Sequence, residues 1–145
     1  MIRLEQKIIP LETGRFFGSD VDGGMIDIAR TNVAKAGFEK WIILKQCSVR
    51  DARPAMPPSS PYRFIVCNPP YGERMGKGDA LEELYRQFGQ TLRNEFPGTR
   101  CGVLVGEKAP IREIGLKSNR RTPMRNGALA CHLVEYEIFK RDEAE

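Results

Sequence analysis

The sequence predicts an α/β fold built on a parallel β-sheet, with helices on both faces and an antiparallel hairpin near the carboxyl end. Three observations lead to this prediction. Short apolar runs alternate with segments of helical periodicity, these runs lack polar alternation, and an Asn-Gly dipeptide separates two extended segments late in the chain. Right-handed crossovers join the strands of such a sheet. Ligands of open parallel sheets bind at the carboxyl ends of the strands, so we expect a ligand site there.

Length and composition agree with one globular domain. The chain has 145 residues, of which 41% are hydrophobic and 29% charged, and no apolar run reaches the ~20 residues that a membrane-spanning helix needs. The first residues alternate charged with apolar side chains and lack a signal-peptide pattern, so we expect a cytoplasmic protein with no membrane partner. We assign residues 1–15 to a residual amino-terminal segment and residues 16–145 to the domain.

The first strand is expected at residues 16–20, where an apolar run ends at Asp20. The following segment, up to about residue 38, has apolar residues at helical spacing, namely Ile26, Ala29, Val33 and Ala36. Asp22 is a candidate N-cap for this helix, and Gly37 is a candidate left-handed stop. The sequence therefore predicts a strand-turn-helix unit over residues 16–38.

Three further apolar runs predict strands that are covered on both faces, at residues 41–44, 64–67 and 103–105. Between the last two, an apolar stripe predicts a helix over residues 79–96. Asp79, with Glu82 three residues later, has the pattern of a capping box. Pro97 and Gly98 then end the helix.

The tail of the chain predicts a β-hairpin. Asn126-Gly127 is a turn signal between extended segments at residues 116–124 and 128–139. Apolar residues in the second arm occupy both phases of a strand, with Leu129, Cys131 and Leu133 in one and Val134, Tyr136 and Ile138 in the other. That strand is therefore either covered on both faces or interrupted by a bulge.

The cysteines and the single histidine do not predict a metal site. Cys47, Cys67, Cys101 and Cys131 are widely spaced, without a C-x-x-C pair, and His132 is the only histidine. Cys67 and Cys101 lie inside apolar runs, which favours buried reduced thiols in a cytosolic core.

The most specific segment is Asn68-Pro69-Pro70-Tyr71, which follows the apolar run of residues 64–67. The two prolines end the strand and restrict the backbone, so the nearby carbonyls point in fixed directions. The side-chain oxygen of Asn68 and a proline carbonyl could accept both hydrogens of a planar exocyclic amine, and Tyr71 offers a face for stacking. Such paired acceptors make the nitrogen lone pair available in the transition state.

Basic residues gather near the hairpin. Between positions 108 and 126 the chain has six Lys or Arg residues and a single acid, Glu113, whereas the net charge of the whole chain is only +4. Lys117, Arg120 and Arg121 could form a compact positive surface for phosphates, although charge runs are more often solvated surface. Arg74 could hold a further phosphate or pair with a neighbouring glutamate.

The order of these motifs resembles that of class I S-adenosylmethionine-dependent amino-methyltransferases, and more closely the THUMP-associated RNA guanine-N2 methyltransferase family. The resemblance covers roughly residues 16–139. It rests on Gly18-Ser-Asp20-Val-Asp22, Ala29-Arg-Thr-Asn32, Ala36-Gly37, Asn68-Pro-Pro-Tyr-Gly-Glu-Arg74, Leu84-Tyr85, Gly115-Leu-Lys117 and Asn126-Gly127. It implies a Rossmann-like sheet of order 3-2-1-4-5-7-6, S-adenosylmethionine as methyl donor, and a nucleic-acid amine as acceptor.

The resemblance also implies roles for individual residues. Asp20 and the adjoining Val21 match the cofactor-binding end of the second family strand, where an acid takes the ribose hydroxyls. Asp51 stands near the position that meets the cofactor adenine, but many relatives place the acid where Ser48 stands here, so Asp51 is either that contact or exposed scaffold. Asn68 is implied at both the cofactor and the amine. The implied substrate-side residues are Arg74, Lys117, Arg120, Arg121 and Asn126.

The sequence departs from the family pattern upstream of Asp20, where the family has a first strand and a glycine-rich cofactor turn. The chain looks like a carboxyl-terminal part of a methyltransferase domain, and we expect it to bind no S-adenosylmethionine and to transfer no methyl group alone. The place of strand 1 would be filled by closure of its two neighbours, by a segment such as residues 7–9, or by a second copy in a homo-oligomer.

Three functions remain open from the sequence. The first is methyl transfer to an exocyclic amine of RNA, with guanine N2 in ribosomal RNA as the favoured acceptor. The second is adenine-N6 methylation of DNA or RNA, because the Asn-Pro-Pro-Tyr motif suits either amine. The third is a non-catalytic RNA-binding fragment.

Overall fold

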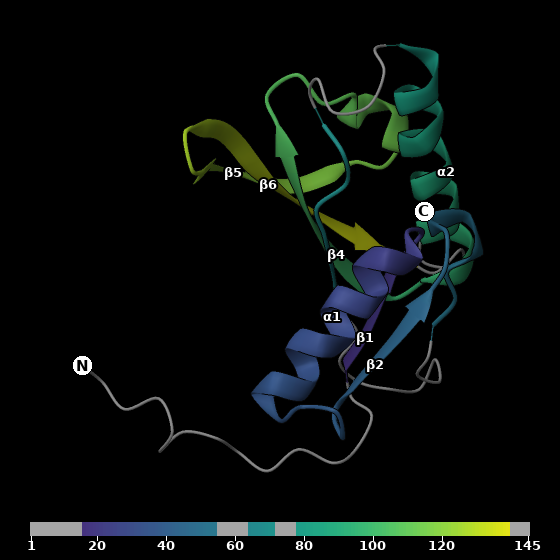
Figure 1. Ribbon diagram of the computed structural model, residues 1–145. Helices are drawn as coiled ribbons and strands as arrows, with labels where there is room; N and C mark the ends of the chain where they lie inside the picture. Colours follow the sequence, from purple (N-terminus) through teal and green to yellow (C-terminus); the bar gives the residue numbers. More distant parts are fainter. Residues whose placement is uncertain (1–15, 55–63, 72–77, 140–145) are drawn as a thin grey trace. The chain divides into compact units, whose positions relative to one another are not determined.

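The computed structural model describes residues 16–54, 64–71 and 78–139 (Figure 1). Contacts between residues divide the chain at the Ser48–Val49 bond into two compact units.

The first unit is a β-α-β element. Strand β1 (Phe16–Asp20) leads through helix α1 (Gly23–Ala36) to strand β2 (Ile42–Gln46), which pairs with β1 in parallel. Asp22 caps α1 by accepting a hydrogen bond from the Gly24 amide, and Gly37 ends the helix with a φ of 73°. The predicted strand-turn-helix is confirmed. Ile26 is the only fully buried side chain within residues 16–48.

The second unit contains a mixed four-stranded sheet. Its elements are η2 (Val49–Asp51), β3 (Phe64–Cys67), α2 (Asp79–Glu95), β4 (Thr99–Gly106), η4 (Ile111–Ile114), β5 (Ser118–Asn126) and β6 (Leu129–Ile138). The strand order is β3-β4-β6-β5, in which β3 is parallel to β4 and the other pairs are antiparallel. Both the predicted parallel strands and the predicted hairpin are present.

Helix α2 forms the core of this unit against one face of the sheet (Figure 1). Its apolar stripe contributes Tyr85, Phe88 and Leu92, which pack with residues of β4 and β6 and with Ile114 of η4. Successive strand residues point to opposite faces, so this face takes Cys101, Val103 and Val105 of β4 and Val134, Tyr136 and Ile138 of β6.

The expectation that every strand is covered on both faces is wrong. In β3, Phe64 is 62% and Val66 is 71% exposed, while the intervening Ile65 packs against the core. The physical reason is that α2 and η4 cover only one face of the sheet within the described residues. An apolar run without polar alternation therefore does not predict that both faces of a strand are buried.

The predicted capping box at the start of α2 is also wrong. The N-cap is Gly78, with a φ of 110° and no side-chain hydrogen bond, and Asp79 is already the first helical residue. The carboxylates of Asp79 and Glu82 still lie in the first turn, where their negative charge interacts favourably with the positive end of the helix dipole.

The hairpin turns at Asn126-Gly127, where Gly127 has a φ of 60°. β6 pairs with β4 without interruption, and the one register shift lies on β5 between Ser118 and Arg120. On the face of β6 opposite Val134, Cys131 is buried but Leu129 is 59% exposed, so β6 has no bulge against β4 and is covered on this second face only in part. β5 is an exposed edge strand that contains Pro123.

Candidate active site

Residues 68–71, called the NPPY loop below, follow directly from β3 in the second unit. Proline has no backbone N–H, so the pair at positions 69 and 70 ends the strand here. Asn68 is exposed, whereas Pro69, Pro70 and Tyr71 are half-buried. The predicted placement of these four residues at the carboxyl end of a parallel strand is confirmed in the structure.

The NPPY loop is held from the helix side by Tyr85. The buried Tyr85 hydroxyl donates a hydrogen bond to the carbonyl oxygen of Pro70 over 3.2 Å. Burial raises the pKa of Tyr85 well above its ordinary value of 10.0, so the hydroxyl remains a donor even at alkaline pH. The Pro70 carbonyl therefore already accepts one hydrogen bond within the protein.

The loop is held from the sheet side through Tyr71. The Nδ2 atom of Asn126 donates to the Tyr71 hydroxyl over 3.1 Å, and the thiol of Cys131 lies 3.7 Å from the same oxygen. The ring rests on Gly106 at the end of β4, where an added Cβ would lie 2.6 Å from Cδ2. Two residues that are 55 positions apart in the sequence, Tyr71 and Asn126, thus share one site.

The basic residues of β5 are exposed but do not share one face. Arg120 pairs in register with Glu135 and Arg121 with Val134, so their side chains leave the strand on opposite sides. Arg120 also forms an ion pair with Glu135 over 3.8 Å, and Nη2 of Arg121 lies 3.4 Å from Nδ1 of His132. The prediction that Lys117, Arg120 and Arg121 form one compact surface is corrected to this extent; Arg121 shares its face with Arg125.

The acid predicted for the cofactor lies in the first unit. Asp20 ends β1 with an exposed carboxylate, whose Oδ1 accepts a hydrogen bond from the Asp22 amide over 2.9 Å. The next residue, Val21, is 67% exposed, and its carbonyl accepts a hydrogen bond from Gln46. The turn after β1 is therefore fixed by its own backbone and by β2.

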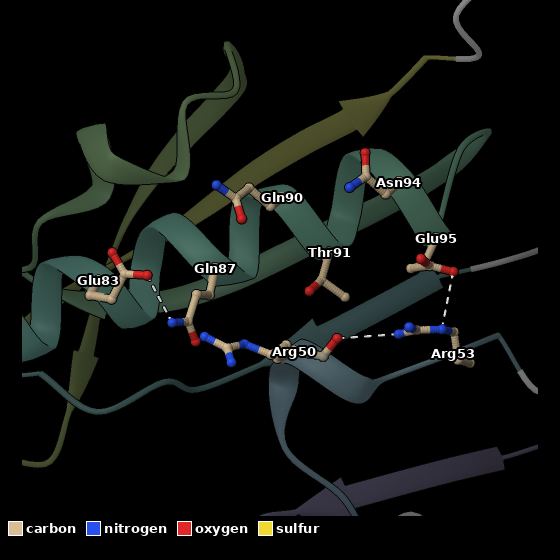
Figure 2. Close-up of a pocket in the computed structure, with 8 residues that line it drawn as sticks. All are labelled: Arg50, Arg53, Glu83, Gln87, Gln90, Thr91, Asn94 and Glu95. Carbon is tan, nitrogen blue, oxygen red and sulfur yellow. Dashed lines mark hydrogen bonds and ion pairs between the residues drawn. The ribbon is translucent and has the colours of Figure 1, made fainter.

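Asp51 ends η2 in the second unit and is exposed. Beside it, Arg50 and Arg53 face α2 across an open polar cavity of about 440 Å³ (Figure 2). Arg53 forms an ion pair with Glu95 over 3.3 Å, and a hydrogen bond from Gln87 lowers the pKa of Glu83. None of the residues predicted from sequence lines this cavity, whose walls are Arg50, Arg53, Glu83, Gln87, Gln90, Thr91, Asn94 and Glu95.

Some predicted features lie outside the described residues. Arg74 belongs to this group, as do Glu73 and residues 7–9. Within the described part of the chain, no cluster of His, Cys, Asp or Glu could hold a metal ion, and no helix is long and apolar enough to cross a membrane.

The cysteines are free thiols, with Cys101 and Cys131 buried and Cys47 and Cys67 half-buried. A hydrogen bond with Cys67, together with burial, raises the pKa of the Cys101 thiol. The prediction of a core thiol is confirmed at Cys101, whereas Cys67 is only half-buried; that both thiols are reduced stays a prediction.

Sequence reasoning missed the contacts that hold the NPPY loop. Tyr85 belongs to a motif of the resemblance, but its helical spacing indicated only a core residue. Gly106 and Cys131 carried no signal, because their roles depend on strand pairing that brings Tyr71 across the end of β4.

Comparison with known proteins establishes the family of the chain. The model of the RMKL-like methyltransferase domain matches residues 2–135 of the chain. The chain belongs to this family. Membership in the RMKL-like methyltransferase family confirms the resemblance inferred from the sequence motifs, and it identifies the chain as a member of an S-adenosylmethionine-dependent methyltransferase family.

Curated relatives of this RMKL-like chain include ribosomal RNA large subunit methyltransferases K/L. The protein of Hahella chejuensis is 34% identical over 133 residues, which cover 91% of this chain and 18% of that protein. The protein of Shewanella frigidimarina is 38% identical over 124 residues, which cover 86% of this chain and 17% of that protein. The chain thus spans less than a fifth of the length of these two relatives.

Solved structures agree with the family. SMU.472 complexed with S-adenosylhomocysteine has a TM-score of 0.75 at 27% identity, covering 86% of this chain and 32% of that one. A possible methylase from Clostridium difficile 630 has a TM-score of 0.77 at 26% identity, covering 94% of this chain and 35% of that one. The RMKL-like chain therefore has a class I methyltransferase-like α/β fold with a mixed sheet and carboxyl-terminal antiparallel strands.

Proposed function

We propose that this chain provides the acceptor site of an enzyme that methylates an exocyclic amine of RNA, with guanine N2 in ribosomal RNA as the acceptor. The observation that carries the proposal is the NPPY loop at the carboxyl end of β3 in a chain of the RMKL-like methyltransferase family. The names of the curated relatives support ribosomal RNA as the substrate class.

The amine would be held by the side-chain oxygen of Asn68 and the carbonyl oxygen of Pro69. The carbonyl of Pro70 is the less suitable acceptor, because it already accepts a hydrogen bond from Tyr85. Two acceptors on one nitrogen favour its pyramidal form, in which the lone pair is no longer delocalised into the base. This arrangement needs no general base of high pKa, and Tyr71 would stack on the base.

The residues of the first unit fit the ribose end of S-adenosylmethionine. The Asp20 carboxylate is exposed at the end of β1, and its orientation is set by the hydrogen bond from the Asp22 amide. A carboxylate has two acceptor oxygens for two ribose hydroxyls. Val21 would lie against the nucleoside. Asp51, which belongs to the second unit, is the proposed acceptor of a hydrogen bond from the adenine amine. When bound, S-adenosylmethionine supplies the electrophilic methyl group.

The RNA would be held by the basic side chains around the hairpin. Arg121 is exposed on β5, and Lys117 precedes this strand, so both are accessible to phosphates. Arg120 can exchange its surface ion pair with Glu135 for a phosphate, and Arg74 completes the proposed set.

The strand orders support the finer topology. The pair β2-β1 and the sheet β3-β4-β6-β5 follow the family order 3-2 and 4-5-7-6. In that order strand 1 would stand between the strands equivalent to β1 and β3. We propose the same order for this protein, with residues 16–145 as the methyltransferase portion.

Nucleotides that differ by one amine test the function. In ¹⁵N-labelled chain, GMP should shift the Asn68 side-chain resonances at millimolar concentration, whereas IMP, which lacks the amine, should not. A response to AMP in place of GMP would favour adenine N6, the second candidate, because the NPPY loop suits either amine. Equal responses to all three nucleotides, or equal responses in the Asn68→Ala variant at the neighbouring loop amides, would contradict an amine site.

A further inference from the structure

The Tyr71 ring is fixed by contacts on two sides. An added Cβ at Gly106 would lie 2.6 Å from Cδ2 and 3.2 Å from Cε2, so the ring lies directly on the backbone of β4. At the far end of the ring, Asn126 donates to the hydroxyl over 3.1 Å. A tyrosine side chain has two main torsions, and contacts at both ends of the ring restrict both of them.

Asn126 occupies a special place in the hairpin. It is the last residue of β5, pairs in register with Leu129, and precedes the turn residue Gly127. The same strand carries the exposed Arg121 and Arg125. The end of the proposed RNA-binding strand is therefore connected to the NPPY loop by one side-chain hydrogen bond.

We infer that Asn126 is a positioning residue, which orients the Tyr71 ring for stacking on an RNA base and does not itself read the base. The inference rests on the proposed function. It replaces the expectation of a direct substrate contact, because the hydrogen bond that the Asn126 amide makes goes to Tyr71, the residue proposed to stack on the base. Bases splayed out of an RNA strand bind by stacking on aromatic rings, and this stacking depends on the orientation of the ring.

A positioning role for Asn126 predicts different effects on RNA affinity and on base stacking, whereas a direct contact would change both together. Loss of the Asn126 amide frees the Tyr71 ring but leaves the phosphate-binding arginines in place. Phosphate contacts supply much of the RNA affinity, whereas stacking acts on a single base. The affinity for RNA should therefore change little while the environment of the stacked base changes strongly.

An RNA stem-loop with one 2-aminopurine in its loop measures both effects, because stacking quenches the fluorescence of this base. Asn126→Ala should keep the Kd within about twofold of wild type while the quenching at saturation falls by about half or more. Tyr71→Phe should give the same loss of quenching, and the double variant should add nothing to either single change. Asn126→Asp should retain the quenching, because a carboxylate accepts a hydrogen bond from the tyrosine hydroxyl.

Arg121→Ala combined with Arg125→Ala is the matched control, which should weaken the affinity and leave the quenching at saturation unchanged. A loss of affinity in Asn126→Ala with normal quenching would show a direct contact and overturn the inference. Absence of RNA binding by the wild type would contradict the proposed function instead. If the wild type does not bind RNA, aromatic NMR of the free chain tests the inference. Asn126→Ala should shift the Tyr71 ring resonances, and unchanged ring resonances would overturn the inference.

Discussion

Asn68 is the residue on which the proposed chemistry depends most directly. Its side chain is exposed at the end of β3, and its carbonyl oxygen is the proposed acceptor for one amine hydrogen. In an active preparation of the enzyme, Asn68→Ala should lower kcat by ~10² and leave cofactor affinity nearly intact, because the contact strengthens in the transition state. Methyl transfer to ribosomal RNA measures the effect. Asn94→Ala, an asparagine of α2 outside the site, is the control, and normal turnover without Asn68 would refute the assignment.

Tyr136 gives the unfolding equilibrium a pH dependence at the alkaline end. Burial raises the pKa of Tyr136 from its ordinary value of 10.0 to about 12. The folded state therefore keeps a proton that the unfolded state loses, so this stabilisation is complete below pH 10 and is lost as the pH rises toward 12. Denaturant unfolding should show stability falling across that interval.

Tyr136→Phe tests this assignment, because it removes the titrating hydroxyl and keeps the ring in the core. The slope of stability against pH should become shallower by up to about 1.4 kcal/mol per pH unit, which corresponds to one proton. Tyr85 and Cys101, whose pKa values are also raised, retain part of the dependence. A slope that does not change in the variant would exclude Tyr136 as its source.

The arginines of β5 differ in how freely they can meet a phosphate. Arg121 and Arg125 share one face of the strand, whereas Arg120 lies on the other and pairs with Glu135. Arg121→Ala with Arg125→Ala should flatten the salt dependence of RNA binding by about two phosphate contacts, each contributing a slope of about 0.7 to 0.9. Arg120→Ala should have a smaller effect, because its surface ion pair competes with the RNA. Equal slopes for all variants would make β5 ordinary solvated surface.

At the residue scale, the sequence predicted what neighbouring residues determine. Asp22 and Gly37 act on their own helix ends, and both roles were evident from local spacing. The bonds from Tyr85 to Pro70 and from Asn126 to Tyr71 join residues 15 and 55 positions apart, and no local pattern encodes them. The roles of Asp20 and Asp51 at a cofactor stay predictions.

At the scale of elements, the contact between α2 and η4 depends on a glycine. A methyl group at Gly89 would overlap the backbone carbonyl oxygen of Ile114, which cannot rotate away as a side chain would. Gly89→Ala should therefore destabilise the protein by about 1 to 3 kcal/mol, although alanine is the better helix former. Denaturant unfolding measures the change, and Gln90→Ala on the polar side of the helix is the control. A stabilised Gly89→Ala would show that the two elements are not in contact.

Strand and helix order could be predicted because each apolar run or stripe is a local property of the chain. The burial of each strand face could not be predicted, since Phe64 and Val66 are as apolar as the residues of a buried strand and yet lie on the exposed face of β3. The start of α2 was misjudged for a related reason: Asp79 suits a cap, but the backbone at Gly78 takes that position.

At the scale of the whole molecule, the two units differ in how much they bury. The second has a continuous core around α2, whereas Ile26 is the only fully buried side chain of residues 16–48. A unit that buries so little apolar surface has little to offset the entropy cost of ordering its chain. Backbone amides of α1 should therefore exchange with deuterium at least ~10-fold faster than those of β4, as mass spectrometry of the chain can measure. Equal protection would indicate one cooperative unit.

Two expectations at this scale stay predictions. One is that the chain alone binds no S-adenosylmethionine, which a calorimetric titration can check. The other is that the place of family strand 1 is filled by closure of its two neighbours, by a segment such as residues 7–9, or by a second copy.

Pro123 bears on how the hairpin avoids other chains. It interrupts the row of backbone donors along β5, which lies at the end of the sheet and has β6 as its neighbour. An edge strand with intact donors invites a strand from another molecule to extend the sheet, and proline together with like charges at Arg120, Arg121 and Arg125 opposes such an addition. The strand that carries the proposed RNA-binding arginines is thereby a poor template for aggregation, so the exposure that a polyanion would need does not also invite strand addition.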